Sequence, residues 1–230
     1  MKWRSLEESA PAADTCTLRE ILAERKESIT KYVPEETRRI RAHEVAELKR
    51  NNLAANIVPA GAEIPQFQLP DQNGKAVASS EILAEKRLVI CFIRGRWCPF
   101  CVAQMEAMNA VLSQIEEAGA RLIAISPQSI KQSFFMHDQH KLRFALLSDA
   151  GNVVARMFRL TYAVSDGSKA LYKRTFVNLP FINGDDSWEL PIPATYIIGR
   201  DGKVQFASAS EDYSERPEPS EILHHLRVSE

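Results

Sequence analysis

The spacing of apolar residues in the middle of the chain predicts a β-α-β unit. Residues 87–93 (Arg-Leu-Val-Ile-Cys-Phe-Ile) and 121–126 (Arg-Leu-Ile-Ala-Ile-Ser) are nearly uninterrupted apolar runs, as in buried central strands. Between them, apolar residues recur at helical spacing over 102–115, and Gly119 is a typical stop for a helix. This pattern places residues 94–101 where the first strand gives way to the helix.

Short strands and turn signals extend this unit into a mixed α/β sheet. An Asn-Gly pair at 73–74 follows a short alternating strand at 64–70, and an Arg-Asp-Gly turn at 200–202 separates strands at 194–198 and 203–207. The other expected elements are helices at 79–83 (capped by Ser79 or Ser80), 129–140, 152–158 and 220–226, a strand at 144–147, and irregular structure over 161–190. The central sheet is then parallel at the crossovers, antiparallel at the hairpin and flanked by helices.

The first part of the chain predicts a helical extension ahead of this sheet. One helix is expected over 17–33, and a second begins at Pro34, since proline suits the first turn of a helix. Residues 1–14 are polar and lack periodicity, which predicts a frayed terminus. We therefore divide the chain into a helical extension, 1–58, and a main domain, 59–230. Packing of the extension on the main domain and a homodimer contact both stay open.

Charge and composition exclude several classes of partner. The 230 residues carry 29 Lys and Arg against 30 Asp and Glu, a net charge of −1, so nothing predicts nucleic-acid binding. No run of about 18 apolar residues is present, so no membrane span is expected. The first ten residues lack the apolar stretch of a secretory signal, and we therefore expect a cytoplasmic protein.

The segment Arg-Gly-Arg-Trp-Cys-Pro-Phe-Cys at 94–101 holds the candidate chemistry. A helix start has free backbone N–H groups and the positive end of the helix dipole, which lower the pKa of a thiol from about 8.5 to about 3.5–7.5. Arg94 and Arg96 act in the same direction. A second thiol one turn along can attack the first after oxidation, so Cys98 and Cys101 provide a nucleophile and a resolving thiol.

The remaining cysteines and histidines do not complete a metal site. Cys91 lies inside an apolar run and is interpreted as a small core residue, and Cys16 precedes a polar helix without an evident role. One C-x-x-C is half of a structural zinc site, and the other half needs a second Cys or His pair. The histidine pairs at 137/140 and 224/225 are not in a zinc-ribbon arrangement with the cysteines, so we expect no metal.

Several segments match motifs of known redox proteins. They are Trp-Cys-Pro-Phe-Cys at 97–101, the strand and hairpin at 61–74, Ala-Ile-Ser-Pro at 124–127, Leu-Leu-Ser-Asp at 146–149 and the hairpin at 193–202. The first resembles the W-C-x-x-C site of thioredoxin. The others resemble the alkyl hydroperoxide reductase and thiol-specific antioxidant family of the peroxiredoxin superfamily, over about 61–228. The resemblance implies a thioredoxin-like α/β fold, peroxide reduction by a Cys98–Cys101 dithiol–disulfide cycle, a thioredoxin- or glutathione-type reductant and no cofactor.

The two resemblances assign different roles to the cysteines. The peroxiredoxin motif P-x-x-x-T-x-x-C, laid without a gap, puts Cys101 on the peroxidatic cysteine, Cys98 on the threonine and Arg94 on the proline. The later arginine of that family has no match, and Pro193 stands near its place. The thioredoxin likeness makes Cys98 the exposed nucleophile and Cys101 the resolving thiol, with Pro193 as a cis-proline facing them. Thr195 follows in the same closing hairpin and is counted as a supporting residue.

Physical reasoning favours Cys98 as the nucleophile. It lies at the helix start, adjoins Arg96 and is expected to be less covered than Cys101, whose burial raises the pKa of its thiol. Trp97 is interpreted either as a shield on one side of the site or as a core aromatic residue. Arg94 and Arg96 either stabilise the thiolate and the peroxide oxygens or are solvated surface charges.

Three functions stay open from the sequence. The preferred one is a thiol peroxidase, in which a sulfenic acid is converted to a disulfide. The second is a thioredoxin-like oxidoreductase that exchanges disulfides with protein partners. The third is a non-catalytic redox sensor or interaction protein that binds a partner through the helices of residues 1–58.

Overall fold

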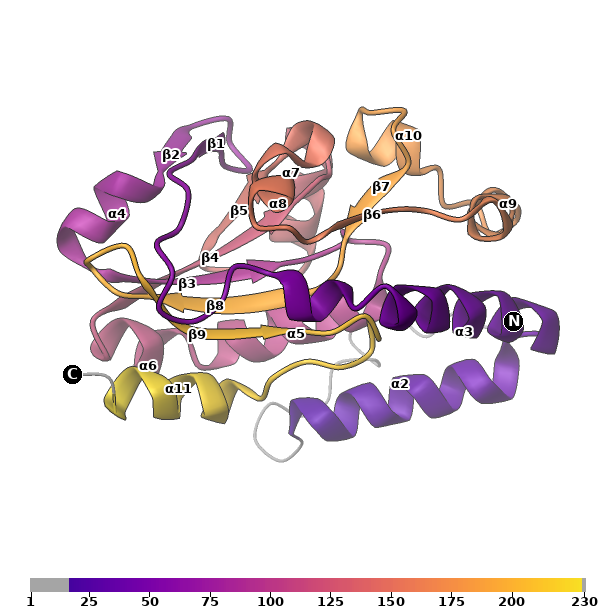
Figure 1. Ribbon diagram of the computed structural model, residues 1–230, viewed down its shortest axis with the longest axis horizontal. Coiled ribbons are helices and arrows are strands. Elements are labelled where there is room, and N and C mark those ends of the chain that lie inside the picture. Colours follow the sequence, from indigo (N-terminus) through magenta and orange to yellow (C-terminus); the bar gives the residue numbers. More distant parts are fainter. Residues whose placement is uncertain (1–16, 229–230) are drawn as a thin grey trace.

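The computed structural model describes residues 17–228, and its centre is a five-stranded mixed sheet (Figure 1). The strand order is β5-β4-β3-β8-β9. The strands are β3 (Arg87–Phe92), β4 (Ala120–Ser126), β5 (Ala145–Ser148), β8 (Ala194–Ile198) and β9 (Val204–Ala209). β4 runs parallel to β3 and β5, whereas β8 runs antiparallel to β3 and β9. The predicted β-α-β unit, closing hairpin and mixed sheet are confirmed.

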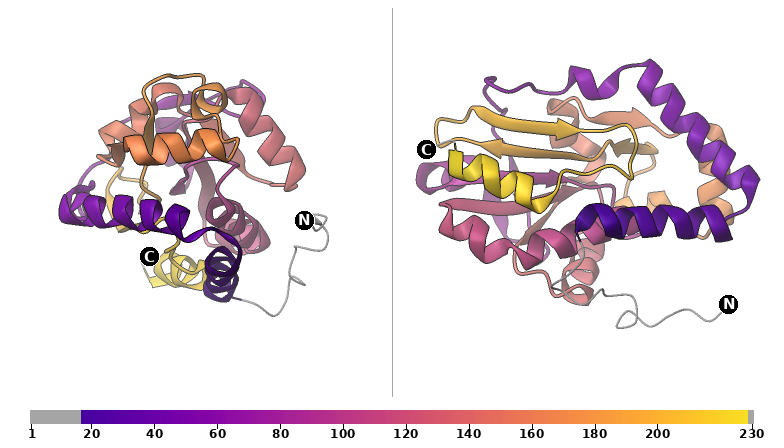
Figure 2. Two further views of the ribbon diagram at one scale, coloured as in Figure 1. Left: turned by 90° about the vertical axis from the view of Figure 1, so that its right-hand side faces the viewer. Right: turned by 90° about the horizontal axis from the view of Figure 1, so that it is seen from below.

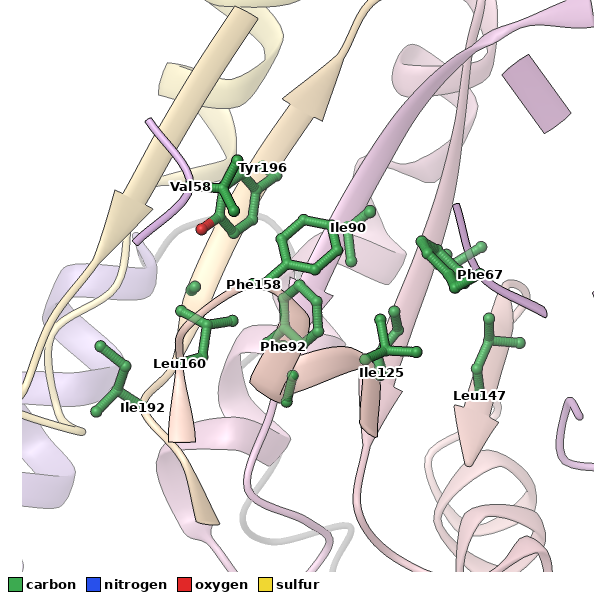
Figure 3. Packing of buried hydrophobic residues seen from close by; sticks show 14 of the residues in the cluster. Val58, Phe67, Ile90, Phe92, Ile125, Leu147, Phe158, Leu160, Ile192 and Tyr196 are labelled. Atoms are coloured by element: carbon green, nitrogen blue, oxygen red, sulfur yellow. The ribbon is translucent and has the colours of Figure 1, made fainter. Parts of the chain in front are cut away.

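Alternate side chains of β3 separate two hydrophobic layers, one on each face of the sheet. Ile90 and Phe92 pack into one layer, where the rings of Phe92, Phe158 and Tyr196 contact one another at centroid distances of 4.9 to 6.0 Å (Figure 3). The intervening residues of β3, including Cys91, face the second layer, which also contains both cysteines of the C-x-x-C. Burial on both faces explains why the strand is an uninterrupted apolar run.

Helices and a small hairpin cover these two faces. One face carries α5 (Pro99–Ala110), α6 (Leu112–Glu117) and α11 (Pro219–Val228). The opposite face carries the hairpin of β1 (Gln68–Pro70) and β2 (Ala76–Ala78), together with α4 (Ser79–Glu85) and α8 (Val153–Met157), which follows η2 (Ala150–Asn152) (Figure 1). α7 (Ile130–Gln139) connects β4 to β5. No helix within 17–228 is long and apolar enough to cross a membrane.

Two N-terminal helices form where the sequence predicts them, α2 (Leu18–Tyr32) and α3 (Glu35–Arg50), followed by η1 (Leu53–Asn56). A capping box of Thr17 and Glu20 begins α2, which packs beside α5 and α11 (Figure 2). Glu218, just ahead of α11, accepts hydrogen bonds from the N–H groups of Leu18 and Arg19 (3.2 and 2.6 Å) and so anchors this helix end. The division of the chain into two domains stays a prediction. The expectations for residues 1–14 and Cys16 lie outside the described residues.

The expectation of irregular structure over 161–190 is wrong. This stretch forms β6 (Thr161–Ala163), α9 (Asp166–Arg174), α10 (Leu179–Asn183) and β7 (Glu189–Pro191), with β6 and β7 paired antiparallel. Ser165 begins α9, because its hydroxyl accepts the N–H of Ser168. Leu171 and Tyr172 are the buried side of this helix, which lies along α3 (Figure 2). Each element is short, so its apolar pattern is too brief to predict alone.

Three smaller expectations also need correction. The helix expected from the C-x-x-C to Gly119 begins where predicted, with Cys98 as its N-cap, but it is interrupted at Val111 between α5 and α6. The strand expected over 64–70 is limited to β1. Neither Ser79 nor Ser80 caps α4, whose N-cap is Ala78. Instead the Ser79 hydroxyl accepts the N–H of Phe67 (3.0 Å), which joins the helix to the segment ahead of β1.

Candidate functional site

Cys98 and Cys101 lie at the start of α5, just after β3. Cys98 is the N-cap residue, Pro99 takes the first helical position, and the N–H of Cys101 donates to the carbonyl of Cys98 (3.0 Å). Gly95 allows the turn between strand and helix. Its φ is +135°, and a Cβ there would lie 2.9 Å from the indole nitrogen of Trp97. The two thiols are therefore one helical turn apart at the strand–helix junction, as the sequence predicts.

Both sulfurs are enclosed. Cys98 is 1% and Cys101 0% exposed, so the expectation of an exposed Cys98 is wrong. The reason is that α3 and α9, which the sequence did not place here, close over this end of the sheet. They leave a cavity of about 130 Å³ that Cys98 lines together with Glu44 of α3 and with Leu171 and Tyr172 of α9.

Arg94 is part of this enclosed site. Its side chain is 2% exposed, and its guanidinium lies between the rings of Trp97 (4.8 Å to the centroid) and Tyr213 (4.5 Å). It also donates a hydrogen bond to the hydroxyl of Tyr172. The interpretation of Arg94 as a solvated charge is therefore wrong. Trp97 contacts the Tyr172 ring edge-on at 5.1 Å and packs against both hydrophobic layers, so it is both a wall of the site and a core residue.

Arg96 points elsewhere. It is exposed, its side chain donates to Gln132 (2.6 Å), and its backbone N–H donates to the side chain of Gln128 (3.0 Å). Its contacts within the described chain are those of a solvated charge held at the surface by α7. A role in stabilising the thiolate stays a prediction for this residue.

Arg216 is the residue that sequence reasoning missed. It lies between β9 and α11, yet its Nη2 donates to the sulfur of Cys101 (3.6 Å), and its Nε donates to Gln104 (2.9 Å). The backbone N–H of Arg94 is a second donor to that sulfur (3.4 Å). No motif marks Arg216, because only the return of the chain from β9 across α5 brings it to the cysteines. It places a positive charge beside the Cys101 sulfur.

Thr195 and Pro193 lie on the side of Arg216. Thr195 is buried and accepts a hydrogen bond from Gln104 (3.1 Å), which links it to Arg216 and not directly to the cysteines of α5. Pro193 precedes β8 and borders a cleft of about 610 Å³ with these two residues. All peptide bonds of residues 17–228 are trans, so the expected cis-proline is wrong. A trans-proline is accommodated here because proline is tolerated at the beginning of a strand.

The pKa values of the two thiols shift in opposite directions. Burial alone would raise the pKa of Cys98, but the neighbouring Cys101 thiol and the charges of Arg94 and Arg216 lower it to about 5. Burial raises the pKa of Cys101 well above its usual value, and the neighbouring Cys98 raises it further. At neutral pH the pair is therefore a thiolate at Cys98 and a thiol at Cys101.

The third described cysteine and the histidines lie outside this chemistry. Burial raises the pKa of Cys91 to about 12, so it stays a thiol inside the second hydrophobic layer. His140 contacts Glu106 (2.9 Å) and not the cysteines. Over residues 17–228, no group of three or more His, Cys, Asp or Glu side chains is arranged to hold a metal ion.

Comparisons with known proteins place these features in a family context. A model of the AhpC/TSA family matches residues 60–207. The chain is similar to chloroplastic peroxiredoxin Q of Oryza sativa subsp. japonica, with 27% identity over 157 residues, which are 68% of this chain and 62% of the rice protein. It is also similar to peroxiredoxin Bcp of Escherichia coli (strain K12), with 24% identity over 150 residues, 65% of this chain and 85% of that protein. The match thus spans less than two thirds of the rice protein.

Solved structures show the same fold. Peroxidoxin BcpB from Mycobacterium tuberculosis has a TM-score of 0.59 at 20% identity, over 74% of this chain and 97% of that chain. Peroxiredoxin Q from Xanthomonas campestris has a TM-score of 0.55 at 20% identity, over 70% of this chain and 90% of that chain. The range matched by the family model leaves out α3 and Arg216, although both contribute to the enclosed site.

Proposed function

Because the chain belongs to the AhpC/TSA family and has the thioredoxin-like fold of peroxiredoxins, we propose that it is a thiol peroxidase. It reduces hydroperoxides through a dithiol–disulfide cycle of Cys98 and Cys101. The observation that carries this proposal is the geometry at the start of α5, where Cys98 lines a cavity together with the buried Arg94 and Cys101 lies one helical turn away. An activated nucleophile, a cationic group for the peroxide oxygens and a resolving thiol are thus together.

The reaction divides into two steps. The Cys98 thiolate attacks the terminal peroxide oxygen, so that an S–O bond forms, the O–O bond breaks, and the sulfur is oxidised to a sulfenic acid. Arg94 stabilises the negative charge that moves onto the leaving oxygen. The Cys101 thiol then attacks Cys98, a disulfide forms and water leaves. Arg216 and the N–H of Arg94 hold the Cys101 sulfur in place for this step.

The enclosure of Cys98 supports a small peroxide as substrate. A cavity of about 130 Å³ beneath α3 and α9 admits a hydroperoxide but not the loop of a protein disulfide. This favours the peroxidase over a thioredoxin-like exchange enzyme, whose nucleophile must be reached by a protein partner. The reduced thiol pair is restored by a thioredoxin- or glutathione-type reductant that supplies two electrons.

A rate comparison tests the proposed function. Wild-type protein is mixed rapidly with hydrogen peroxide and, separately, with a protein disulfide such as insulin, with Cys91→Ser as a control for the buried third thiol. We expect fast oxidation by peroxide in both proteins and slow reduction of insulin. Peroxide oxidation no faster than that of a free thiolate would reject the proposal, and fast insulin reduction would favour the exchange enzyme.

We also propose that the protein works in the cytoplasm and that it forms a homodimer. The C-x-x-C pair supports the first point, because a reducing compartment such as the cytoplasm keeps such a pair in the dithiol state between turnovers. Exposed aromatic side chains at Phe134, Phe176 and Phe181 support the second, since they offer apolar surface for a second copy. Light scattering of the reduced and oxidised protein measures the oligomeric state, and a monomer in both states would exclude the dimer.

A further inference from the structure

Tyr172 lies in the cavity beside Cys98 but has no role in the cycle described so far. It belongs to α9, is 6% exposed and lines the cavity together with Cys98. Its ring packs edge-on against Trp97, which fixes its direction. The charges of Arg94 and Cys98 are both close enough to act on its hydroxyl.

The hydroxyl of Tyr172 has a proton to give. Arg94 donates its Nη2–H to the phenolic oxygen, so the oxygen is an acceptor in this contact and its own O–H is not used by it. Within residues 17–228, no side chain or backbone group accepts that proton. The hydroxyl therefore stands ready to donate to whatever occupies the cavity.

Peroxide cleavage needs such a donor. When the O–O bond breaks, the leaving oxygen departs as hydroxide or alkoxide, and for hydroxide the conjugate acid is water, with a pKa of about 15.7. Burial raises the pKa of Tyr172 to about 12, an increase that the charge of Arg94 limits. The phenol is thus protonated at neutral pH. It is nevertheless a stronger acid than water, so it can give its proton to the leaving hydroxide.

We propose that Tyr172 is a catalytic residue that protonates the leaving oxygen of the peroxide while the Cys98 thiolate attacks. This rests on the proposed function. The thiolate, the hydroperoxide and the Tyr172 phenol yield the sulfenic acid of Cys98, an alcohol or water, and a Tyr172 phenolate. The sulfur loses two electrons and the peroxide gains them. Arg94 stabilises the phenolate through its existing hydrogen bond, and solvent returns the proton afterwards.

Other groups of the cavity are less suited to this role. Glu44 is buried, but its carboxylate accepts hydrogen bonds from both the N–H and the hydroxyl of Ser165, so it acts as an acceptor. Arg94 remains charged throughout, because a guanidinium does not lose its proton in proteins. Cys101 keeps its proton for the second step.

The test compares peroxides that differ in their leaving groups. Hydrogen peroxide expels hydroxide and needs an acid, whereas peracetic acid expels acetate, the weakly basic anion of a carboxylic acid, which needs none. Oxidation of Cys98 is measured by rapid mixing for wild type, Tyr172→Phe and Tyr162→Phe. The last variant removes a buried phenol that is near Arg94 but does not line the cavity.

We expect Tyr172→Phe to slow the reaction with hydrogen peroxide about 100-fold and the reaction with peracetic acid by less than about threefold. In Tyr162→Phe, the ratio of the two rate constants should stay at the wild-type value. Equal slowing of both peroxides by Tyr172→Phe would overturn the proposal, because the hydroxyl would then act only by placing Arg94. A wild type that shows no fast reaction with either peroxide would instead reject the proposed function itself.

Discussion

The thiolate of Cys98 determines how peroxide oxidation depends on pH. Because only the thiolate attacks, the rate follows its fraction, and the pKa of about 5 places the loss of activity on the acid side. The rate constant should be level above neutral pH and should fall as the pH drops through about 5. Rapid mixing of the wild-type protein with peroxide across this range measures the profile. A rate that still rises above neutral pH would mean that the attacking thiol has an ordinary pKa.

Arg216 should contribute to this low pKa, whereas Arg96 should contribute little. Replacement of Arg216 by Met removes a positive charge next to the thiol pair and should raise the pKa of Cys98 by about one unit or more. The matched variant is Arg96→Met, in which an exposed guanidinium bound to Gln132 is lost. The ultraviolet absorbance of the thiolate, followed against pH, measures both. Equal shifts in the two variants would show that the contact between Arg216 and the thiol pair does not set the effect.

The cysteines of the site could be predicted from the sequence, but their surroundings could not. Two thiols at a strand–helix junction follow from local pattern alone, and so does their separation by one turn. Arg216 and Tyr172 meet them only through tertiary structure, from segments that carry no motif. The burial of Cys98 was missed for the same reason, because its cover comes from α3 and α9.

At the scale of elements, the contact between α3 and α9 controls access to Cys98. Ser165 both caps α9 and donates to Glu44 of α3 (3.3 Å from its N–H and from its hydroxyl). Ser165→Ala should cost about 1 kcal/mol of helix stability and loosen this cover. Alkylation of Cys98 by a bulky maleimide should then accelerate more than alkylation by iodoacetamide.

Glu36→Gln is the control for this variant. Glu36 and Arg174 also join α3 to α9 (3.5 Å), but both side chains are largely exposed, and such pairs contribute little. The bulky and the small reagent should therefore react with this variant as they do with wild type. If Ser165→Ala likewise leaves their ratio unchanged, the cover does not control access.

Elements with long, uninterrupted patterns were predictable and short ones were not. β3 and β4 follow from uninterrupted apolar runs that are buried in the sheet, and α2 and α3 follow from apolar residues at helical spacing. The elements between residues 161 and 190 span only three to nine residues. Their stability comes from packing on α3 and on the sheet, which no local pattern reports.

At the scale of the whole molecule, the site is assembled from the family fold and from the chain on either side of it. The range matched by the family model supplies the two cysteines, Arg94 and Tyr172. Glu44 comes from before that range, and Arg216 comes from after it. Cys98 and Cys101 are one helical turn apart, so the disulfide forms by local movement at the start of α5.

The most direct test of this account is to trap the first oxidation product on each cysteine. The variants Cys101→Ser and Cys98→Ser receive one equivalent of hydrogen peroxide in the presence of a reagent specific for sulfenic acid, and mass spectrometry locates the adduct. The account predicts a rapid adduct on Cys98 in the first variant and no fast reaction in the second. An adduct on Cys101 in the Cys98→Ser variant, formed at the wild-type rate, would contradict it.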